Sequence, residues 1–393
     1  MFTLGCNAHP SEKPSNPCLI KRAKPSPAIL VVCSNCRRKQ FTMDFCSRTF
    51  LSLIFTSSVI LSGCSRHLEP IQSIEVAAKG LHSAAISEDA SLSVIGSIHH
   101  GGSLWRHEDG ERLFNWNHET EEPSTLVAMD FSDDGRWALT AATHTLVLWN
   151  TGTGRAERFW TAPAEVLDVE LDAEGRLALL GLSDHSAVIF DVRRGGIRRV
   201  FQHQNRVRSV DFSRDRKYVL TGSEDYTAAL WEAESGKLIS KIKHEDDVQL
   251  VRLSDDGKLA LSVSKYDKAI IWRSEDAQKI AEVPLKAEHI KRGTRFTSAR
   301  FSSDNLHLLT GRPDQLVQLW SVPDYDMQNI DEKNSEYTLE ELARWRLPKR
   351  SAWKPTGAAV LDVAFGLNNT SFWALASNGY LHKLSNKENV HAP

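Results

Sequence analysis

The chain has 393 residues, with 48 lysines and arginines, 50 aspartates and glutamates, and a formal net charge of −2. Residues 1–63 hold 8 of the basic and 2 of the acidic residues, so the remaining chain carries 40 basic and 48 acidic residues, a net charge of −8. An acidic chain without a long basic stripe is a poor candidate for binding nucleic acid. All six cysteines lie at or before Cys64, which agrees with an oxidising compartment without proving one.

Residues 1–42 contain five prolines and one acidic residue and are followed by Met43. We interpret them as an upstream extension from a misassigned start, and we expect the native protein to begin at Met43. Two alternatives remain if the extension is translated. The Cys-Ser-Asn-Cys segment at 33–36, with Cys6 and Cys18, suits zinc, and a basic, acid-poor stretch suits an organelle presequence.

An apolar run of twelve residues, Phe50 to Leu61, comes next and leads into Ser62-Gly63-Cys64. The run is too short to span a bilayer, but its length suits the apolar region of a signal peptide. Its end, Leu-Ser-Gly-Cys, resembles the lipobox of bacterial lipoproteins. That resemblance implies a signal peptide over 43–63, lipid on the Cys64 thiol and cleavage before it, and Ser65 implies sorting to the outer membrane. A buried hydrophobic strand is the alternative interpretation.

From Ile86 to Leu384 the chain repeats one spacing seven times. An apolar first anchor is followed by an apolar second anchor eight residues later, and usually by an aromatic third anchor eleven residues after that. The first anchors are Ile86, Phe131, Leu171, Phe212, Leu253, Phe301 and Phe365. They are 45, 40, 41, 41, 48 and 64 residues apart, and self-similarity at this period indicates stacked units.

Each unit is predicted to contain four short strands. Apolar residues with a period of two surround the first anchor, and Ser132-Asp133-Asp134-Gly135 is typical of the turn that follows it. Five residues beyond the third anchor, a hairpin needs a residue with positive φ. This position holds Gly110, Gly154, Gly195, Gly236 and Ala277. A fourth strand, such as Leu238 to Ile242, completes the unit. A lone sheet of this size cannot bury both faces, so the units must stack face to face.

The repeat resembles a known family. Leu148-Trp149 and Leu230-Trp231 resemble the repeat-ending dipeptides of WD40 proteins, and Thr221-Gly222-Ser223-Glu224-Asp225 resembles one of the family's inner segments. The similarity covers roughly residues 71–385 and implies an all-β, seven-bladed WD40-type β-propeller. The sequence departs from the family where Leu384 replaces Trp, and almost no unit keeps the acidic residue after the aromatic one.

The two ends of the repeat region are expected to meet. The last unit, 359–384, has three predicted strands, whereas Ile71 to Val76 is a single strand before the first unit. We therefore expect the N-terminal strand to become the outer strand of the last blade and to close the ring. Residues 64–70 are then a tether, and residues 386–393 a tail.

An insertion of about residues 324–350 interrupts the spacing after the sixth unit. Thr338 to Trp345 is predicted to be a short helix, because Thr338 and Glu341 have the spacing of a capping box. The basic residues near Trp345 and Trp353 offer a contact patch, but packing of the tryptophans against the blade is the simpler interpretation.

Four residues of the fourth unit resemble the structural tetrad of WD40 repeats, in which an aspartate orients a histidine. They are His203, Thr221, Asp225 and Trp231. Histidine, aspartate and a hydroxyl also suggest a hydrolase triad. However, the aspartate recurs as Asp184 and Asp314, so the arrangement belongs to the scaffold, where a buried carboxylate requires hydrogen bonds. Units with His99, His144 or Tyr266 at this position are predicted to have lost the pattern.

Signals for metal or cofactor chemistry are weak. His99, His100 and His107 lack the spaced carboxylate or cysteine partners of a metal site. The sequence contains no HExxH motif, phosphate-binding loop or nucleophile elbow. We predict no catalytic residue, no cofactor and no metal.

Loops on the face that bears His203 and Asp225 resemble the usual WD40 contact surface. The candidate partner-binding residues are Arg206, Arg208, Glu224, Asp247, Gln249, Arg295 and Thr297. Their mixed charges suit a polar protein interface better than a small-molecule pocket. We expect a non-catalytic protein–protein interaction scaffold, lipid-anchored through Cys64 on the periplasmic side of the outer membrane. The alternatives are a propeller enzyme or sensor that binds a small ligand in the central channel, and a cytosolic WD40 scaffold.

Overall fold

The computed structural model describes residues 67–119, 123–285, 289, 295–323, 337–349 and 358–386. The chain divides into two units, 1–62 and 63–393, and the first lies wholly outside the described residues. The expected extension, signal peptide and Cys64 therefore lie outside them as well. Among the described residues, no helix is long and apolar enough to cross a membrane.

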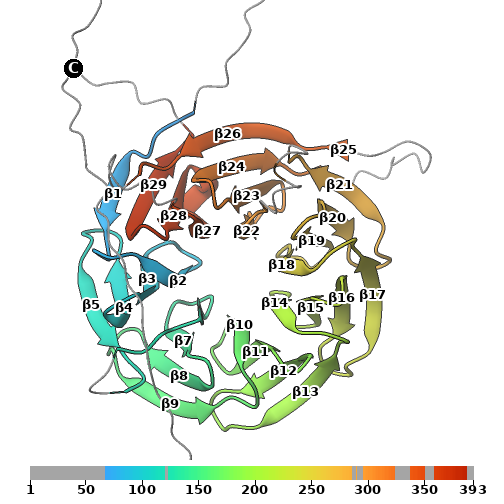
Figure 1. Cartoon of the computed structure of the whole chain (residues 1–393), viewed down its shortest axis with the longest axis horizontal. Coiled ribbons are helices and arrows are strands. Elements are labelled where there is room, and N and C mark those ends of the chain that lie inside the picture. The colour runs from blue at the N-terminus through green and yellow to red at the C-terminus, as the bar shows by residue number, and fades with distance from the viewer. Residues whose placement is uncertain are drawn as a thin grey trace, which may run out of the picture. The chain divides into compact units, whose positions relative to one another are not determined.

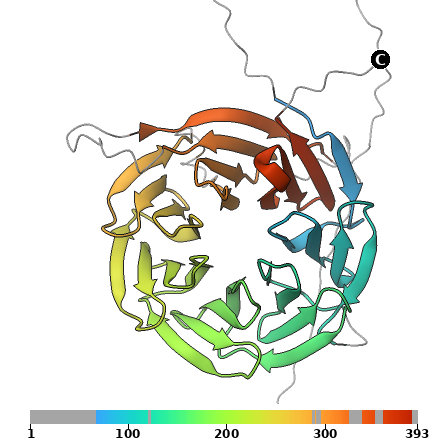
Figure 2. The same cartoon turned by 180° about the vertical axis from the view of Figure 1, so that it is seen from behind.

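Seven sheets surround a common axis in the unit 63–393, as Figures 1 and 2 show from opposite sides. The predicted seven-bladed propeller is confirmed. In each blade we call the strands a to d from the axis outward; consecutive strands are antiparallel.

Blades 1 to 4 each use four strands that follow one another in the chain. Blade 1 contains β2 (Leu81–Ile86), β3 (Leu92–Ser97), β4 (Gly101–Arg106) and β5 (Arg112–Trp116). Blade 2 contains β6 (Ala128–Phe131), β7 (Trp137–Ala141), β8 (Thr145–Asn150) and β9 (Ala156–Thr161). Blade 3 contains β10 (Val166–Leu171), β11 (Leu177–Leu182), β12 (Ser186–Asp191) and β13 (Ile197–Gln202). Blade 4 contains β14 (Val207–Phe212), β15 (Tyr218–Ser223), β16 (Thr227–Glu232) and β17 (Leu238–Lys243).

Blades 5 to 7 depart from this simple order. Blade 5 contains β18 (Val248–Leu253), β19 (Leu259–Ser264), β20 (Ala269–Arg273) and β21 (Lys279–Val283), with β25 (Tyr337–Thr338) added in parallel at its outer edge. Blade 6 contains β22 (Ser298–Phe301), β23 (His307–Gly311), β24 (Leu316–Ser321) and β26 (Glu340–Arg346). Blade 7 contains β27 (Val360–Phe365), β28 (Ser371–Ala376) and β29 (Tyr380–Ser385), with the short 3-10 helix η1 (Leu367–Asn369) between its first two strands.

The ring is closed by the N-terminal strand, as expected. β1 (Gln72–Glu75) pairs antiparallel with β29, and Gln72 lies opposite Lys383. β1 is thus the outer strand of blade 7, although it precedes blade 1 in the chain (Figure 1). The chain contacts blade 6 just before this strand, because Leu68 forms a parallel bridge to Trp345 in β26.

The predicted helix over Thr338–Trp345 is wrong, because residues 340–346 form β26, the outer strand of blade 6. Its burial has a period of two: Ala343 and Trp345 are buried, whereas Leu342 and Arg346 on either side of them are exposed. The packing expected of Trp345 is confirmed, since its ring is fully buried and lies 5.1 Å from the Phe372 ring. Residues 324–336 and 350–357, with Trp353, lie outside the described part of the chain.

The core lies between neighbouring blades. One cluster joins Val94 and Leu104 of blade 1 to Phe131 and Trp149 of blade 2, and removal of such side chains from water stabilises the stack by about 25 cal/mol per Å². The hairpins after strand c also follow the prediction. Gly154 has a φ of 70° and lies against the Phe114 ring, where a Cβ atom would be only 2.4 Å from the ring. Ala277 adopts a φ of 58° at the same position without glycine.

Candidate functional site

The antiparallel strands place alternate turns on two opposite faces of the ring. We call the face that carries connections such as 224–226, between strands b and c, the b–c face. The opposite face carries the a–b and c–d turns, such as 213–217 and 233–237, and we call it the c–d face.

The structure brings the four predicted tetrad residues of blade 4 together. His203 Nδ1 lies 2.9 Å from Asp225 Oδ2, and His203 Nε2 lies 2.7 Å from Thr221 Oγ1. The indole N–H of Trp231 donates to the same Thr221 Oγ1 at 2.8 Å. A carboxylate only accepts, so His203 Nδ1 carries a proton and donates it to Asp225, while the Thr221 hydroxyl lies within hydrogen-bond distance of both His203 Nε2 and the Ala229 carbonyl. The four side chains form one continuous hydrogen-bonded chain.

Electrostatics and burial favour a structural role for this chain. Burial alone would raise the pKa of Asp225, but hydrogen bonds from His203, Thr227 and the Gln204 N–H hold it well below its ordinary value. Thr221 is fully buried, and it lines neither the cavity between the innermost strands nor the groove beside Arg193. Its hydroxyl oxygen is occupied by the Trp231 N–H and offers no access to a substrate. The arrangement fixes side chains and leaves no free nucleophile.

Blade 5 retains the whole pattern, contrary to the prediction from Tyr266, and blade 2 retains it without the aspartate. In blade 5, His244 Nε2 lies 2.7 Å from Ser262 Oγ, and His244 Nδ1 lies 3.3 Å from Asp267. The connection 265–268 is one residue longer than 224–226, which moves the aspartate one place along the sequence. The indole N–H of Trp272 completes the chain by donating to Ser262 at 3.1 Å.

In blade 2 a hydroxyl replaces the carboxylate. His118 Nδ1 lies 2.6 Å from Thr145 Oγ1, and His118 Nε2 lies 2.8 Å from Thr140 Oγ1. The indole N–H of Trp149 donates to Thr140 at 2.8 Å. Blade 1, with His99 at the aspartate position, differs: the indole N–H of Trp105 donates to Ser103 two residues earlier.

The recurring aspartates of blades 3 and 6 have other partners. Asp184 accepts both the N–H and the hydroxyl of Ser186, and Asp314 accepts a two-pronged ion pair from Arg312 at 2.9 and 2.7 Å. These local contacts fix the b–c turns. They support a scaffold role for the aspartate position in these blades.

The three histidines considered for a metal do not share one environment. His107 is buried 4.5 Å from the Trp373 ring, and burial lowers its pKa to about 4. His99 and His100 are exposed. No group of three or more metal-ligating side chains occurs among the residues that the structure describes.

The predicted partner-binding residues lie in and beside the connections of the b–c face of blades 4 to 6; we call them the partner rim. Arg208 Nε donates to Glu224 Oε1 at 2.5 Å, and the Arg206 carbonyl accepts the Glu224 N–H at 2.9 Å. Burial, Glu224 and Asp246 raise the pKa of Asp247, and burial and Arg208 lower that of Arg295. Thr297 is partly used within the ring, since its hydroxyl donates to the Val360 carbonyl at 2.6 Å.

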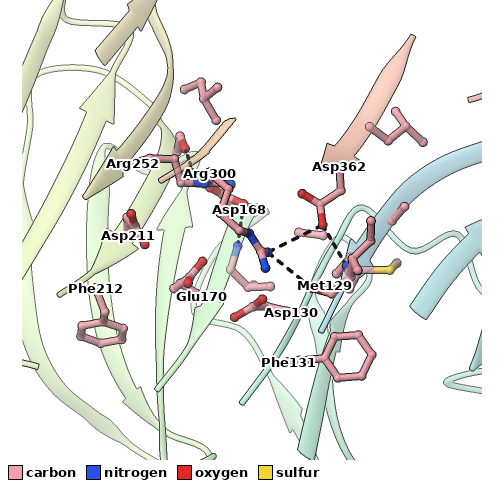
Figure 3. A pocket seen from close by; sticks show the side chains of 18 of the residues that line it. Met129, Asp130, Phe131, Asp168, Glu170, Asp211, Phe212, Arg252, Arg300 and Asp362 are labelled. Carbon is pink, nitrogen blue, oxygen red and sulfur yellow. Dashed lines mark hydrogen bonds and ion pairs between the residues drawn. The ribbon is translucent and has the colours of Figure 1, made fainter. Parts of the chain in front are cut away.

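A charged cavity of about 330 Å³ runs along the axis, and sequence reasoning missed the side chains that line it. Figure 3 shows carboxylates and arginines from several blades converging on it. The lining includes Asp130, Asp168, Glu170, Asp211, Arg252, Arg300 and Asp362. Arg208, Gln249 and Thr297 of the partner rim also line it. The available signal was a charged residue directly before the first anchor in five of the seven units.

The cavity carboxylates connect neighbouring blades. Asp211 accepts the Leu253 N–H at 2.5 Å, and Asp362 accepts the Ile86 N–H at 2.8 Å across the closing junction. Burial raises the pKa of Asp130 to about 8 and that of Asp211 to about 6. Burial and the neighbouring Asp130 raise the pKa of Glu170 well above its ordinary value. The axis is therefore a low-dielectric environment that disfavours further negative charge.

Comparison with known proteins agrees with the architecture. The family model for the WD domain, G-beta repeat, matches residues 195–232, which contain β13 to β16 and all four tetrad residues of blade 4. No curated protein matches the chain. The matched repeat and the seven-bladed ring together support placing this chain in the WD40 propeller family.

Proposed function

We propose that this protein is a non-catalytic platform for protein partners, anchored by lipid at Cys64 on the periplasmic side of the bacterial outer membrane. WD40 propellers commonly mediate protein interactions. The observation that carries the proposal is the commitment of His203, Thr221 and Asp225 to one another inside blade 4. These three residues resemble a hydrolase triad, but their hydrogen bonds to one another give them a structural role. The partner rim, in contrast, presents charges of both signs.

The position of Leu68 supports the lipid anchor. The Leu68 N–H donates to the Arg344 carbonyl at 2.8 Å, and the Arg346 N–H donates to the Leu68 carbonyl at 3.0 Å. Leu68 follows Cys64 by only four residues, which span at most about 14 Å. The lipobox-like sequence thus stands immediately before the ring, where a lipoprotein needs it. Several acyl chains make such an anchor stable, because one chain binds a membrane only reversibly.

Metabolic labelling with a fatty acid tests the anchor in the bacterial cell. We expect the wild-type protein to incorporate the label and to fractionate with the outer membrane, and the Cys64→Ala variant to lose both properties. An unlabelled, soluble wild-type protein with residues before Cys64 still attached would contradict the anchor and favour the cytosolic scaffold.

Crosslinking in intact envelopes, followed by affinity capture, tests the partner rim. Charge reversal by Arg206→Glu and Asp247→Lys is expected to abolish specific crosslinks. Lys241→Glu, on the exposed outer strand β17, provides the matched control and should retain them. Crosslinks that survive both rim substitutions would refute this surface.

The axial cavity supports the second candidate function, a sensor of a small ligand. Its volume of about 330 Å³ lies at the lower end of the range for ligand pockets, and its lining is highly charged. Native mass spectrometry of the purified protein distinguishes the candidates. A tightly bound metabolite, together with no captured protein partner, would favour the sensor.

A further inference from the structure

A groove of about 980 Å³ lies on the c–d face, opposite the partner rim. It is formed by the a–b turns of blades 2, 3 and 4 and by the c–d turn of blade 3. Its arginines are Arg136, Arg176, Arg193, Arg194, Arg198 and Arg216. Three acidic residues, Asp134, Glu174 and Asp191, lie among them, so the lining carries a net positive charge in a chain whose propeller region is acidic. We call this site the arginine groove.

Several of these arginines are held in place by the blades. The Arg193 guanidinium lies 3.6 Å over the Trp137 ring of blade 2, and its Nε donates to the Gly175 carbonyl at 2.7 Å. Arg216 Nη1 donates at 2.8 Å to Asp172, which is buried. Stacking on an aromatic face and pairing with a buried carboxylate both fix a guanidinium before a ligand arrives. The floor of the groove is therefore preorganised.

Two arginines remain available at the surface. Arg194 is exposed, and its guanidinium makes no hydrogen bond or ion pair with the residues that the structure describes. Arg136 is largely exposed and has only a loose ion pair, 3.6 Å long, with Asp134. A planar guanidinium in this state can bind a carboxylate through two parallel hydrogen bonds.

We propose that the arginine groove binds an acidic, partly apolar segment of a partner protein. The volume of the groove, about 980 Å³, matches the largest pockets that bind small molecules, so the groove accommodates several side chains of a peptide. Its interspersed carboxylates would repel a densely charged polyanion such as polyphosphate, whereas acidic residues spaced along a peptide can alternate with them. Trp137 and Leu177 add half-buried apolar surface for the side chains between those acidic residues. The surface is separate from the partner rim and would serve a second partner.

Fluorescence anisotropy with the full-length protein in detergent tests the proposal. The probe is a labelled twelve-residue peptide that repeats Glu-Leu-Ser-Glu, and the same peptide with Gln for Glu is its control. We expect Arg194→Glu to raise the Kd of the acidic peptide about fivefold and Arg136→Glu/Arg194→Glu to raise it more than about tenfold. Lys241→Glu makes a similar change of charge on β17, outside both the arginine groove and the partner rim, and should leave the Kd within about twofold of wild type.

The outcomes are decisive in both directions. Equal Kd values for wild type and Arg194→Glu, or equal binding of the Glu and Gln peptides, would overturn the proposal. So would arginine-dependent binding of polyphosphate or of phosphatidylglycerol vesicles without binding of the acidic peptide. If the double variant does not reach the wild-type melting temperature, Arg194→Ala removes one exposed charge and keeps the test open. Crosslinks lost through Arg206→Glu report on the partner rim alone, so the two surfaces are judged separately.

Discussion

Asp130 of blade 2 accepts the backbone N–H of Leu171 in blade 3 at 2.7 Å, so a carboxylate joins two blades at the wall of the axial cavity. Asp211 makes the equivalent contact to Leu253 between blades 4 and 5. The strands nearest the axis belong to different sheets and share no ladder of hydrogen bonds. These carboxylates supply polar links where packing would otherwise act alone, but the same location makes their ionisation costly.

Replacement of Asp130 by Asn is expected to stabilise the protein in alkaline solution. Burial raises the pKa of Asp130 to about 8, so the folded protein holds this proton more tightly than the unfolded chain. The free energy of unfolding of the wild type should therefore fall as the pH rises from about 4 to about 8. Asp130→Asn keeps an oxygen acceptor for Leu171 and removes this loss. Urea unfolding should show a gain of about 2 kcal/mol at pH 8.5 and little gain at pH 5.

Asp211→Asn is the matched control for this pH dependence, because Asp211 occupies the same position two blades further on. The pKa of Asp211 is raised only to about 6, so the gain in stability from Asp211→Asn should reach its full size by pH 7. If the Asp130→Asn variant and the wild type lose stability in parallel between pH 5 and pH 8.5, Asp130 is ionised throughout and the argument fails.

Thr221→Val is expected to destabilise the protein by about 1 to 3 kcal/mol, although the two side chains have nearly the same shape. The substitution removes the oxygen that receives the Trp231 N–H and leaves His203 Nε2 without its hydrogen-bond partner, both inside the blade. Urea unfolding at pH 7 measures the loss. Thr221→Ser retains the hydroxyl and should cost clearly less. A loss for Thr221→Ser without a loss for Thr221→Val would show that the methyl group, and not the hydrogen-bonded chain, matters here.

The periodic part of the fold was predictable because each unit must bury the same faces. Apolar anchors such as Phe212 and Leu220 recur in the register of paired strands, and the closing role of residues 71–76 followed from a missing fourth strand. The helix over Thr338–Trp345 failed for a physical reason. A short segment with apolar residues at 339, 342 and 343 fits two periodicities, and only the open edge of β24 selects the strand.

The candidate sites were less predictable, since they depend on contacts between units. The aspartate that pairs with the tetrad histidine moves along the sequence when the connection changes length by one residue, as Asp267 shows in blade 5. In blade 2 the hydroxyl of Thr145 takes the place of the carboxylate. The cavity charges come from separate blades and meet only because the ring is closed. The arginine groove likewise needs Trp137 of blade 2 beneath Arg193 of blade 3, a contact that no single repeat reveals.

Ile74→Ala is expected to weaken the closure of the ring. Ile74 pairs with Leu381 and packs beside Ala77 and Trp373 in the core between blades 7 and 1, so its truncation should cost about 1 to 2 kcal/mol. Hydrogen exchange should become faster in β29 and β28 as well as in β1, because these strands share one sheet. Gln72→Ala, at an exposed position of the same strand, should change neither quantity. Faster exchange restricted to residues 72–75 would mean that the ring stays closed without this strand.

Lipid attachment at Cys64 would hold one side of the ring close to the membrane. Leu68 is fixed to blade 6, and the four residues back to Cys64 reach about 14 Å at most.

Residues after Cys64 contain no cysteine, so a fluorophore can be placed on a single introduced thiol. In the wild-type background, spin-labelled lipid should quench a fluorophore at Glu69→Cys strongly. At Glu234→Cys, in blade 4 across the ring from β1 (Figure 1), quenching should be weak. In a Cys46→Ser/Cys64→Ala background, in which the uncleaved signal peptide adds no second thiol, neither position should be quenched. Equal, strong quenching at both positions would instead mean that the ring lies flat on the bilayer and that contacts other than the short tether set its orientation.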